Sequence, residues 1–138
     1  ASASAKERPA NPSIVGLWDT TWLVGQGPLV WDEGYEQWHS DGTELNVDNA
    51  VPPSLGNVCV GVYKQIAPRT YSLRHVTWNW DEFGNRAGSF LLLMTVTTDV
   101  HGNTFTGTYV SDSFDLDGNV IPALHAEGVV NGRRIMVD

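Results

Sequence analysis

Three five-residue segments share one pattern: DEFGN at residues 81–85, DVHGN at 99–103 and DLDGN at 115–119. Each begins with Asp and ends with Gly-Asn, and both of these last residue types tolerate the positive φ angles that tight hairpin turns require. The spacing between the segments leaves room for strands of roughly ten residues. The pattern therefore predicts consecutive antiparallel strands joined by hairpins, which is a meander.

The residues between the turn signals suit strands, because Val, Thr, Trp, Tyr and Phe pack well on a pleated surface. Phe105, Gly107 and Tyr109 alternate with threonines, and Trp18, Thr20 and Trp22 alternate with Asp19 and Thr21. No stretch of eleven or more residues shows a sustained helical stripe. We expect eight strands, at residues 14–24, 28–40, 43–48, 57–65, 69–80, 86–99, 103–114 and 119–131.

Eight short strands leave two sheet edges exposed unless the sheet closes on itself. A two-sheet sandwich is the rival architecture, but sandwiches usually contain a long crossover connection. The three similar hairpins in a row favour up-and-down order instead. We therefore predict an all-β protein: a single eight-stranded up-and-down antiparallel β-barrel over residues 13–138, preceded by a disordered leader at residues 1–12.

Composition excludes several classes of function. Eight Lys and Arg against sixteen Asp and Glu give a net charge of −8, which disfavours binding to nucleic acid or to anionic membrane surfaces. The longest apolar run, Phe90 to Met94, is far shorter than the ~20 residues of a membrane-spanning helix. The single cysteine, Cys59, excludes an intramolecular disulfide and a cysteine-built metal site, and we expect it to be inert packing.

The first residues, ASASAKERPANP, are small, polar and proline-containing. Such a segment is what remains when a secretory signal is removed at a small-residue site, so we expect a secreted or periplasmic protein, and otherwise a cytoplasmic one.

Gly16-Leu17-Trp18 opens the first predicted strand, and Arg133 and Arg134 follow the last one. This arrangement resembles the calycin pattern of lipocalins, fatty-acid-binding proteins and avidins, and the chain length is similar to that of avidin-type or nitrobindin-type barrels. The resemblance implies that Trp18 lies at a closed barrel floor and that Arg133 or Arg134 packs over its indole, because a guanidinium is attracted to an aromatic face.

Large aromatic side chains are numerous, with six Trp and four Tyr. An eight-stranded barrel has an interior that side chains nearly fill or that holds one small ligand. Inward aromatic rings with hydroxyl tips would suit a small, apolar or aromatic ligand. The residues predicted to line this ligand site are Trp18, Trp22, Tyr35, His39, Tyr63, Tyr71 and Tyr109. The alternative is that these rings simply fill the barrel.

A second hypothesis is a cofactor-free isomerase, cyclase or lyase that uses the same interior. His125 and Glu127 are two residues apart and share one face of the last strand, and His75 lies on another strand. Burial would bring the pKa of each group nearer to 7, as proton transfer requires. We expect Glu33 and Glu36 to point outward into water, as most carboxylates do.

A third hypothesis is a metal- or haem-binding barrel with histidine ligands. His39, His75 and His125 fall on three predicted strands, and convergence inside a barrel would give a three-imidazole site for zinc, copper or iron. No metal-binding spacing motif occurs in the chain, so the sequence assigns no metal ligand and no cofactor.

The strand around Leu91 and Leu93 is apolar on both faces, since Phe90, Leu92 and Met94 alternate with these two leucines. A barrel strand with a solvated outer face normally alternates in polarity. We therefore expect the outer face to be covered, most simply by a second copy in a two-fold homodimer, and Trp78 and Trp80 to share that patch. Coverage by the leader or by the 43–57 segment is the alternative.

Overall fold

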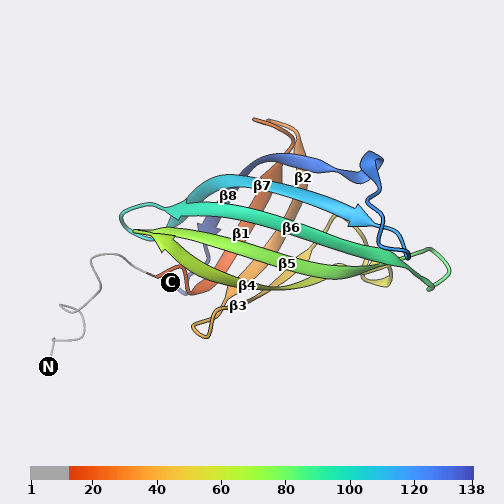
Figure 1. Ribbon diagram of the computed structural model, residues 1–138. Coiled ribbons are helices and arrows are strands. Elements are labelled where there is room, and N and C mark those ends of the chain that lie inside the picture. Colours follow the sequence, from red (N-terminus) through yellow and green to blue (C-terminus); the bar gives the residue numbers. More distant parts are fainter. Residues whose placement is uncertain (1–12) are drawn as a thin grey trace, which may run out of the picture.

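A computed structural model describes residues 13–138 as a closed eight-stranded barrel in which every neighbouring pair of strands is antiparallel (Figure 1). The leader predicted at residues 1–12 lies outside the described residues. The strands are β1 (Gly16–Leu23), β2 (Val30–Trp38), β3 (Thr43–Asp48), β4 (Val58–Ala67), β5 (Thr70–Trp80), β6 (Arg86–Thr98), β7 (Thr104–Phe114) and β8 (Ala126–Arg134), with two short 3-10 helices, η1 (Pro53–Leu55) and η2 (Pro122–Leu124).

The strands follow one another around the barrel in chain order, and β1 pairs with β8 to close it. Up-and-down topology is therefore confirmed, and the two-sheet sandwich is not formed. Along the described part of the chain, no helix is long and apolar enough to cross a membrane.

The three repeated turns are built alike, as the shared pattern predicted. The Oδ1 atoms of Asp81, Asp99 and Asp115 each accept a hydrogen bond of 2.8–2.9 Å from the backbone N–H of the asparagine four residues later. The glycine of each turn has a φ between +74° and +83°, a conformation that L side chains rarely adopt. These turns explain why the hairpin register is firmly set.

The last strand differs from the prediction, which placed it at residues 119–131. In the structure Val120 forms only an isolated bridge with Phe114, and the chain then makes η2 before β8 begins at Ala126. Pro122 explains the delay, because proline has no N–H to donate to a sheet ladder and it sits at the start of η2.

One end of the barrel is a packed aromatic floor. Trp18 is buried and packs on Phe105 with ring centroids 4.8 Å apart, and its Nε1–H donates to the carbonyl of Ile14 at 2.8 Å. The Arg134 guanidinium lies 4.4 Å from the Trp18 ring centroid and donates to three backbone carbonyls at 2.6–2.7 Å. Arg134 therefore covers Trp18 as the calycin resemblance implied, whereas Arg133 is exposed beside Asp19.

Candidate functional site

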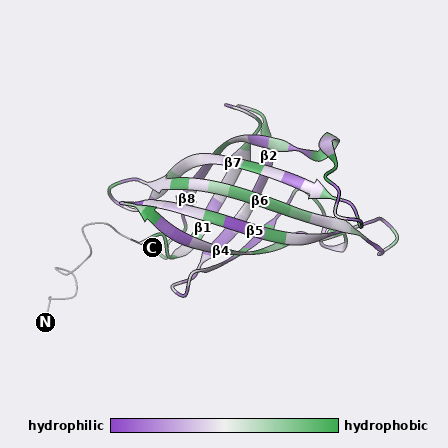
Figure 2. Cartoon of the chain, viewed as in Figure 1, coloured by the Kyte–Doolittle hydropathy of each residue, from purple (hydrophilic) through white to green (hydrophobic). Residues whose placement is uncertain are grey.

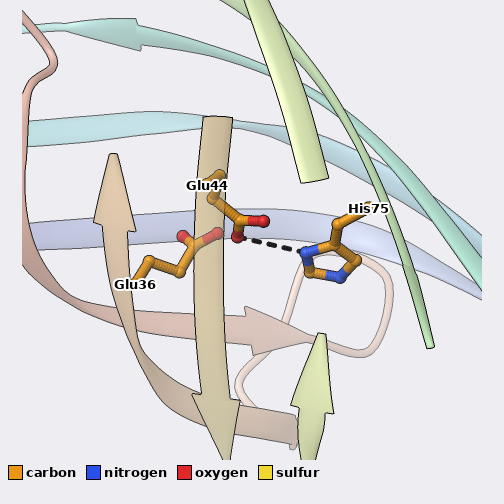
Figure 3. Close-up of side chains that lie close together, drawn as sticks. All are labelled: Glu36, Glu44 and His75. Atoms are coloured by element: carbon orange, nitrogen blue, oxygen red, sulfur yellow. Dashed lines mark hydrogen bonds and ion pairs between the residues drawn. The ribbon is translucent and has the colours of Figure 1, made fainter. Parts of the chain in front are cut away.

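Three side chains with reactive atoms meet in the barrel interior: Glu36 on β2, Glu44 on β3 and His75 on β5 (Figure 3). All three are buried, and Glu36 has no exposed surface. One nitrogen or oxygen from each lies within 4.8 Å of the corresponding atom in the other two. Strand alternation explains the inward placement, because Glu36 points to the same side of β2 as the buried Trp38.

Hydrogen bonds fix part of this cluster and leave part of it unpaired. The Thr20 hydroxyl donates to Glu36 Oε1 at 2.8 Å, and His75 Nδ1 lies 3.1 Å from Glu44 Oε2. Among the described residues, Glu36 Oε2 and Glu44 Oε1 are buried with no hydrogen-bond partner. Unpartnered buried carboxylate oxygens are rare, so these two atoms are candidate ligands for a cation. They can also share one proton, in a hydrogen bond between the two carboxyl groups that raises the pKa of Glu36 and lowers that of Glu44.

The interior strongly disfavours charge on these groups. Burial raises the pKa of Glu36 well above its ordinary value, and the neighbouring Glu44 carboxylate adds to this effect. Burial raises the pKa of Glu44 to about 7. Burial lowers the pKa of His75, which makes its imidazole neutral at neutral pH. With Glu44 ionised, His75 Nδ1 carries the ring proton and donates to the carboxylate, which leaves Nε2 with a free lone pair.

A glycine makes room for the cluster. Gly61 on β4 lies between Glu44 and His75, and a Cβ atom at this position would lie 2.7 Å from Glu44 Oε1 and 2.7 Å from His75 Cβ. Any larger residue would push the carboxylate and the imidazole apart. The absence of a side chain at residue 61 is therefore part of how the sequence builds this site.

A second pair of carboxylates, Asp32 and Asp48, extends the acidic interior toward the end of the barrel opposite Trp18. Burial and the neighbouring Asp48 raise the pKa of Asp32 to about 7, and burial also raises the pKa of Asp48. Cys59 is buried beside them, and burial raises its thiol pKa far above the ordinary value. The thiol is therefore protonated and unreactive, which agrees with the inert role expected for it.

Aromatic rings surround the imidazole. The ring centroids of Trp22 and Phe90 lie 6.5 Å and 6.2 Å from that of His75. Trp31 stacks on Tyr109 at 5.3 Å and on Phe90 at 6.3 Å. Trp31 reaches this position because the β1–β2 register shifts between Trp22 and Leu23, which leaves it unpaired in the ladder.

The predicted ligand-lining residues divide between the two faces of the barrel wall. The buried members are Trp18, Trp22, Tyr71 and Tyr109, and Tyr63 is partly buried and packs on the core. Tyr35 is 59% exposed, and His39 lies beyond the end of β2, where it contacts Gln37 and Thr43. The inward placement of Tyr35 and His39 is therefore wrong, because the even-numbered residues of β2 face inward. Whether a ligand binds among the interior rings stays a prediction.

The expected acid–base groups also separate. His75 is in the interior, whereas His125 and Glu127 are exposed and contact each other at 3.0 Å, with Asp112 2.7 Å from the other imidazole nitrogen. The pairing of His125 with Glu127 on one face is confirmed, but that face is the outer one. A three-imidazole site is also not formed, because His39 and His125 lie outside the interior that holds His75.

The expectation that Glu36 points into water is wrong, and Glu44 escaped notice as a site residue. A signal for both exists in the sequence: Glu36 is two residues from Trp38, and large aromatic residues indicate the buried side of a strand. Glu33, by contrast, is on the outer face, as expected.

Comparison of the sequence with known protein families and with curated proteins finds no match. The resemblance to calycins therefore extends to a closed antiparallel eight-stranded barrel and to its Trp18–Arg134 floor. Any assignment of function depends on the geometry of the interior.

Proposed function

We propose that the barrel interior binds one divalent transition-metal ion through Glu36, Glu44 and His75. The observation that carries this proposal is a pair of buried, unpartnered carboxylate oxygens, Glu36 Oε2 and Glu44 Oε1, next to a buried imidazole. The two carboxylates would supply oxygen ligands, and His75 would supply Nδ1, the ring nitrogen 3.1 Å from Glu44 Oε2, with the ring proton moved to Nε2.

Charge balance supports a divalent ion. Two ionised carboxylates and a neutral imidazole carry a charge of −2, which a divalent cation cancels in a place where uncompensated charge is costly. Without an ion the same groups must keep protons to remain buried, as the raised pKa values of Glu36 and Glu44 indicate. Binding of the metal would therefore release the protons that Glu36 and Glu44 otherwise keep.

The spacing of the atoms is close to what one ion requires. Ligand atoms bonded to a single ion at about 2.0–2.2 Å lie at most about 4.4 Å apart. The three candidate ligand atoms lie within 4.8 Å of one another, so side-chain shifts of about 1 Å would bring them to the roughly 3.5 Å separation of ligands in a tetrahedral site. Thr20 holds Glu36 Oε1 from behind, as outer-shell partners of metal ligands do.

The donor set indicates the class of metal. One imidazole with two carboxylates suits zinc, iron(II), manganese or cobalt, whereas calcium and magnesium prefer oxygen ligands alone. Cys59 does not belong to this cluster, since its Sγ lies beside Asp48, 4.0 Å from Oδ2. An ion in this site would act as a Lewis acid toward a bound small molecule.

Titration of metal-free protein with Zn²⁺ and Co²⁺ tests the proposal. We expect one ion per chain by calorimetry and a cobalt absorbance spectrum of a nitrogen–oxygen site. Glu36→Gln, Glu44→Gln and His75→Gln should each weaken binding by more than the roughly 10–100-fold that loss of an outer-shell partner costs. Thr20→Val should fall within that 10–100-fold range.

Two matched controls separate this site from adventitious surface binding. Glu33→Gln changes a carboxylate on the outer face of the same strand, and His125→Gln changes an exposed imidazole. Both should bind zinc as the unaltered chain does, and circular dichroism confirms that all variants are folded. The proposal would be refuted if Glu36→Gln, Glu44→Gln and His75→Gln bound zinc as tightly as the unaltered chain. Loss of zinc binding in His125→Gln alone would refute it as well.

A second candidate function is proton transfer without a metal, in which Glu44 orients His75 and Nε2 acts as the base. The hydrogen bond from Nδ1 to Glu44 Oε2 and the adjacent Trp22 and Phe90 rings favour it. This function is that of a cofactor-free isomerase, cyclase or lyase acting on a small aromatic or apolar molecule. Mass spectrometry of compounds that copurify with the protein would identify such a molecule, and turnover in the presence of EDTA would favour this function over the metal site.

A further inference from the structure

The outer wall formed by β4, β5, β6 and the end of β7 carries an apolar groove that the interior site does not use. The groove has a volume of about 740 Å³, which lies within the usual range of about 300–1,000 Å³ for small-molecule sites. Its apolar lining comes from Val58, Val60, Val76, Trp78, Leu91 and Phe114. Figure 2 shows hydrophobic residues recurring along β5 and β6, the strands that form the middle of this wall.

The side chains on this wall are outward and accessible. Trp78 is 54% exposed and Leu93 is 42% exposed, so the strand face on which we expected a covering partner is open in the described residues. An isolated exposed apolar residue needs no explanation, but a continuous groove of this size indicates a binding surface. The outward apolar residues of β6, which the sequence pattern singled out, therefore belong to an exposed apolar surface.

Three cationic side chains lie on this wall. Arg74 lines the apolar groove and also a smaller hollow of about 210 Å³ that includes Lys64 and Ser72. Arg86 lies on the same wall, with its guanidinium 4.3 Å from the Trp78 ring centroid. Within residues 13–138, none of these three cations forms a salt bridge, whereas Arg133 pairs with Asp19. An otherwise acidic protein thus places Arg74 in the lining of this apolar groove, with Lys64 and Arg86 elsewhere on the same wall.

We propose that this groove binds a small anionic amphiphile, such as a medium-chain carboxylate, with the carboxylate between Arg74 and Lys64 and the apolar chain along Val60, Val76 and Trp78. A guanidinium recognises a carboxylate in a bidentate manner, and burial of the apolar chain supplies the hydrophobic contribution. This site lies on the outer wall, so the proposal is independent of the metal site in the interior.

Charge complementarity selects this occupant over a second copy of the chain. A two-fold dimer through the same wall would place Lys64, Arg74 and Arg86 of both copies, six cations in all, in one largely apolar interface. Like charges facing each other across an apolar interface are costly. An anionic amphiphile instead neutralises Arg74 while it covers the apolar side chains.

Binding of dodecanoate below its micelle concentration, measured by calorimetry, tests the proposal. We expect one molecule per chain, with no comparable binding of dodecyltrimethylammonium, which has the same chain and the opposite charge. Arg74→Gln should weaken dodecanoate binding roughly tenfold or more, because a charge-assisted contact is lost. Val76→Glu should abolish binding by placing a carboxylate in the groove, and Arg133→Gln should leave it unchanged because Arg133 is not on this wall.

Several results would overturn the proposal. They are equal affinity for the cationic amphiphile, unchanged binding in Arg74→Gln, and no binding of dodecanoate by a folded chain. Sedimentation of the same samples distinguishes the remaining occupant: a dimer that Val76→Glu dissociates, with no dodecanoate bound, would assign the wall to a second copy instead. Zinc titration of Arg74→Gln should match that of the unaltered chain, so failure here is distinguishable from failure of the metal site.

Discussion

Replacing Glu44 with glutamine should change how the stability of the metal-free protein depends on pH. Glu44 has a pKa of about 7 in the folded chain against an ordinary value of 4.5, and burial is the main cause. Between these two values the folded state holds a proton that the unfolded state has released. The free energy of unfolding therefore falls as the pH rises, and this one carboxyl accounts for roughly 2–3 kcal/mol between pH 5 and pH 8.

In Glu44→Gln the side chain has no proton to lose, and the amide oxygen still accepts the hydrogen bond from His75 Nδ1. We expect the variant to be similar to the unaltered chain at pH 5 and more stable at pH 8 by roughly 2 kcal/mol. Glu36 and Asp32 have raised pKa values for the same main reason, so a residual dependence with the same sign should remain.

Urea unfolding in EDTA at pH 5 and pH 8, followed by tryptophan fluorescence, measures both free energies. Glu33→Gln on the outer face of β2 is the matched control and should keep the full dependence of the unaltered chain. Parallel pH dependence in Glu44→Gln and in the unaltered chain would refute the reasoning. Zinc adds a further check: it should raise the stability of the unaltered chain most at high pH, because metal binding releases protons.

Three further outcomes are expected. Arg134→Met should lower the free energy of unfolding by about 2–4 kcal/mol, because it removes the cation over Trp18 and three hydrogen bonds to carbonyls. Urea unfolding measures this loss, and a value below about 0.5 kcal/mol, as for an ordinary surface change, would contradict the prediction. Gly107→Ala should prevent barrel formation, since its Cβ would overlap the Thr95 carbonyl oxygen, and a native-like circular dichroism spectrum would contradict this. His125 should titrate above its ordinary pKa of 6.5 by NMR, because Asp112 and Glu127 accept from its ring; Asp112→Asn should lower that pKa, and no change would contradict the ion pair.

Local rules were sufficient for most of the fold. The Asp-x-x-Gly-Asn turns specify their own hydrogen bonds within five residues, so sequence reasoning locates them and the strands between them. The late start of β8 also depends on a local feature of the sequence, since Pro122 could have predicted it. The Trp18–Arg134 contact is not local, and only the resemblance to calycins indicated it.

The interior site depends on relations that no local rule supplies. Glu36, Glu44 and His75 come from three strands, and they converge only because β2, β3, β4 and β5 are neighbours in a closed sheet. The face of a strand is also sensitive to a shift of one residue, which moves every side chain to the opposite side. For this reason we expected Tyr35 to point inward and Glu36 outward, whereas the structure has the reverse. The position of Trp38, on the same side of β2 as Glu36, could have indicated the correct assignment.

The pairing of β1 with β8 has a consequence for the order of folding. Each of the other strand pairs joins neighbours in the chain, whereas the Trp18–Arg134 register joins residues more than a hundred positions apart. Loop-closure entropy costs about 0.6 kcal/mol for each doubling of loop length, so this seam costs about 2 kcal/mol more than a hairpin. The hairpins should therefore form first, and the β1–β8 pairing should form late in folding. Burial of the Trp18 indole accompanies this last step, so its fluorescence should report on it.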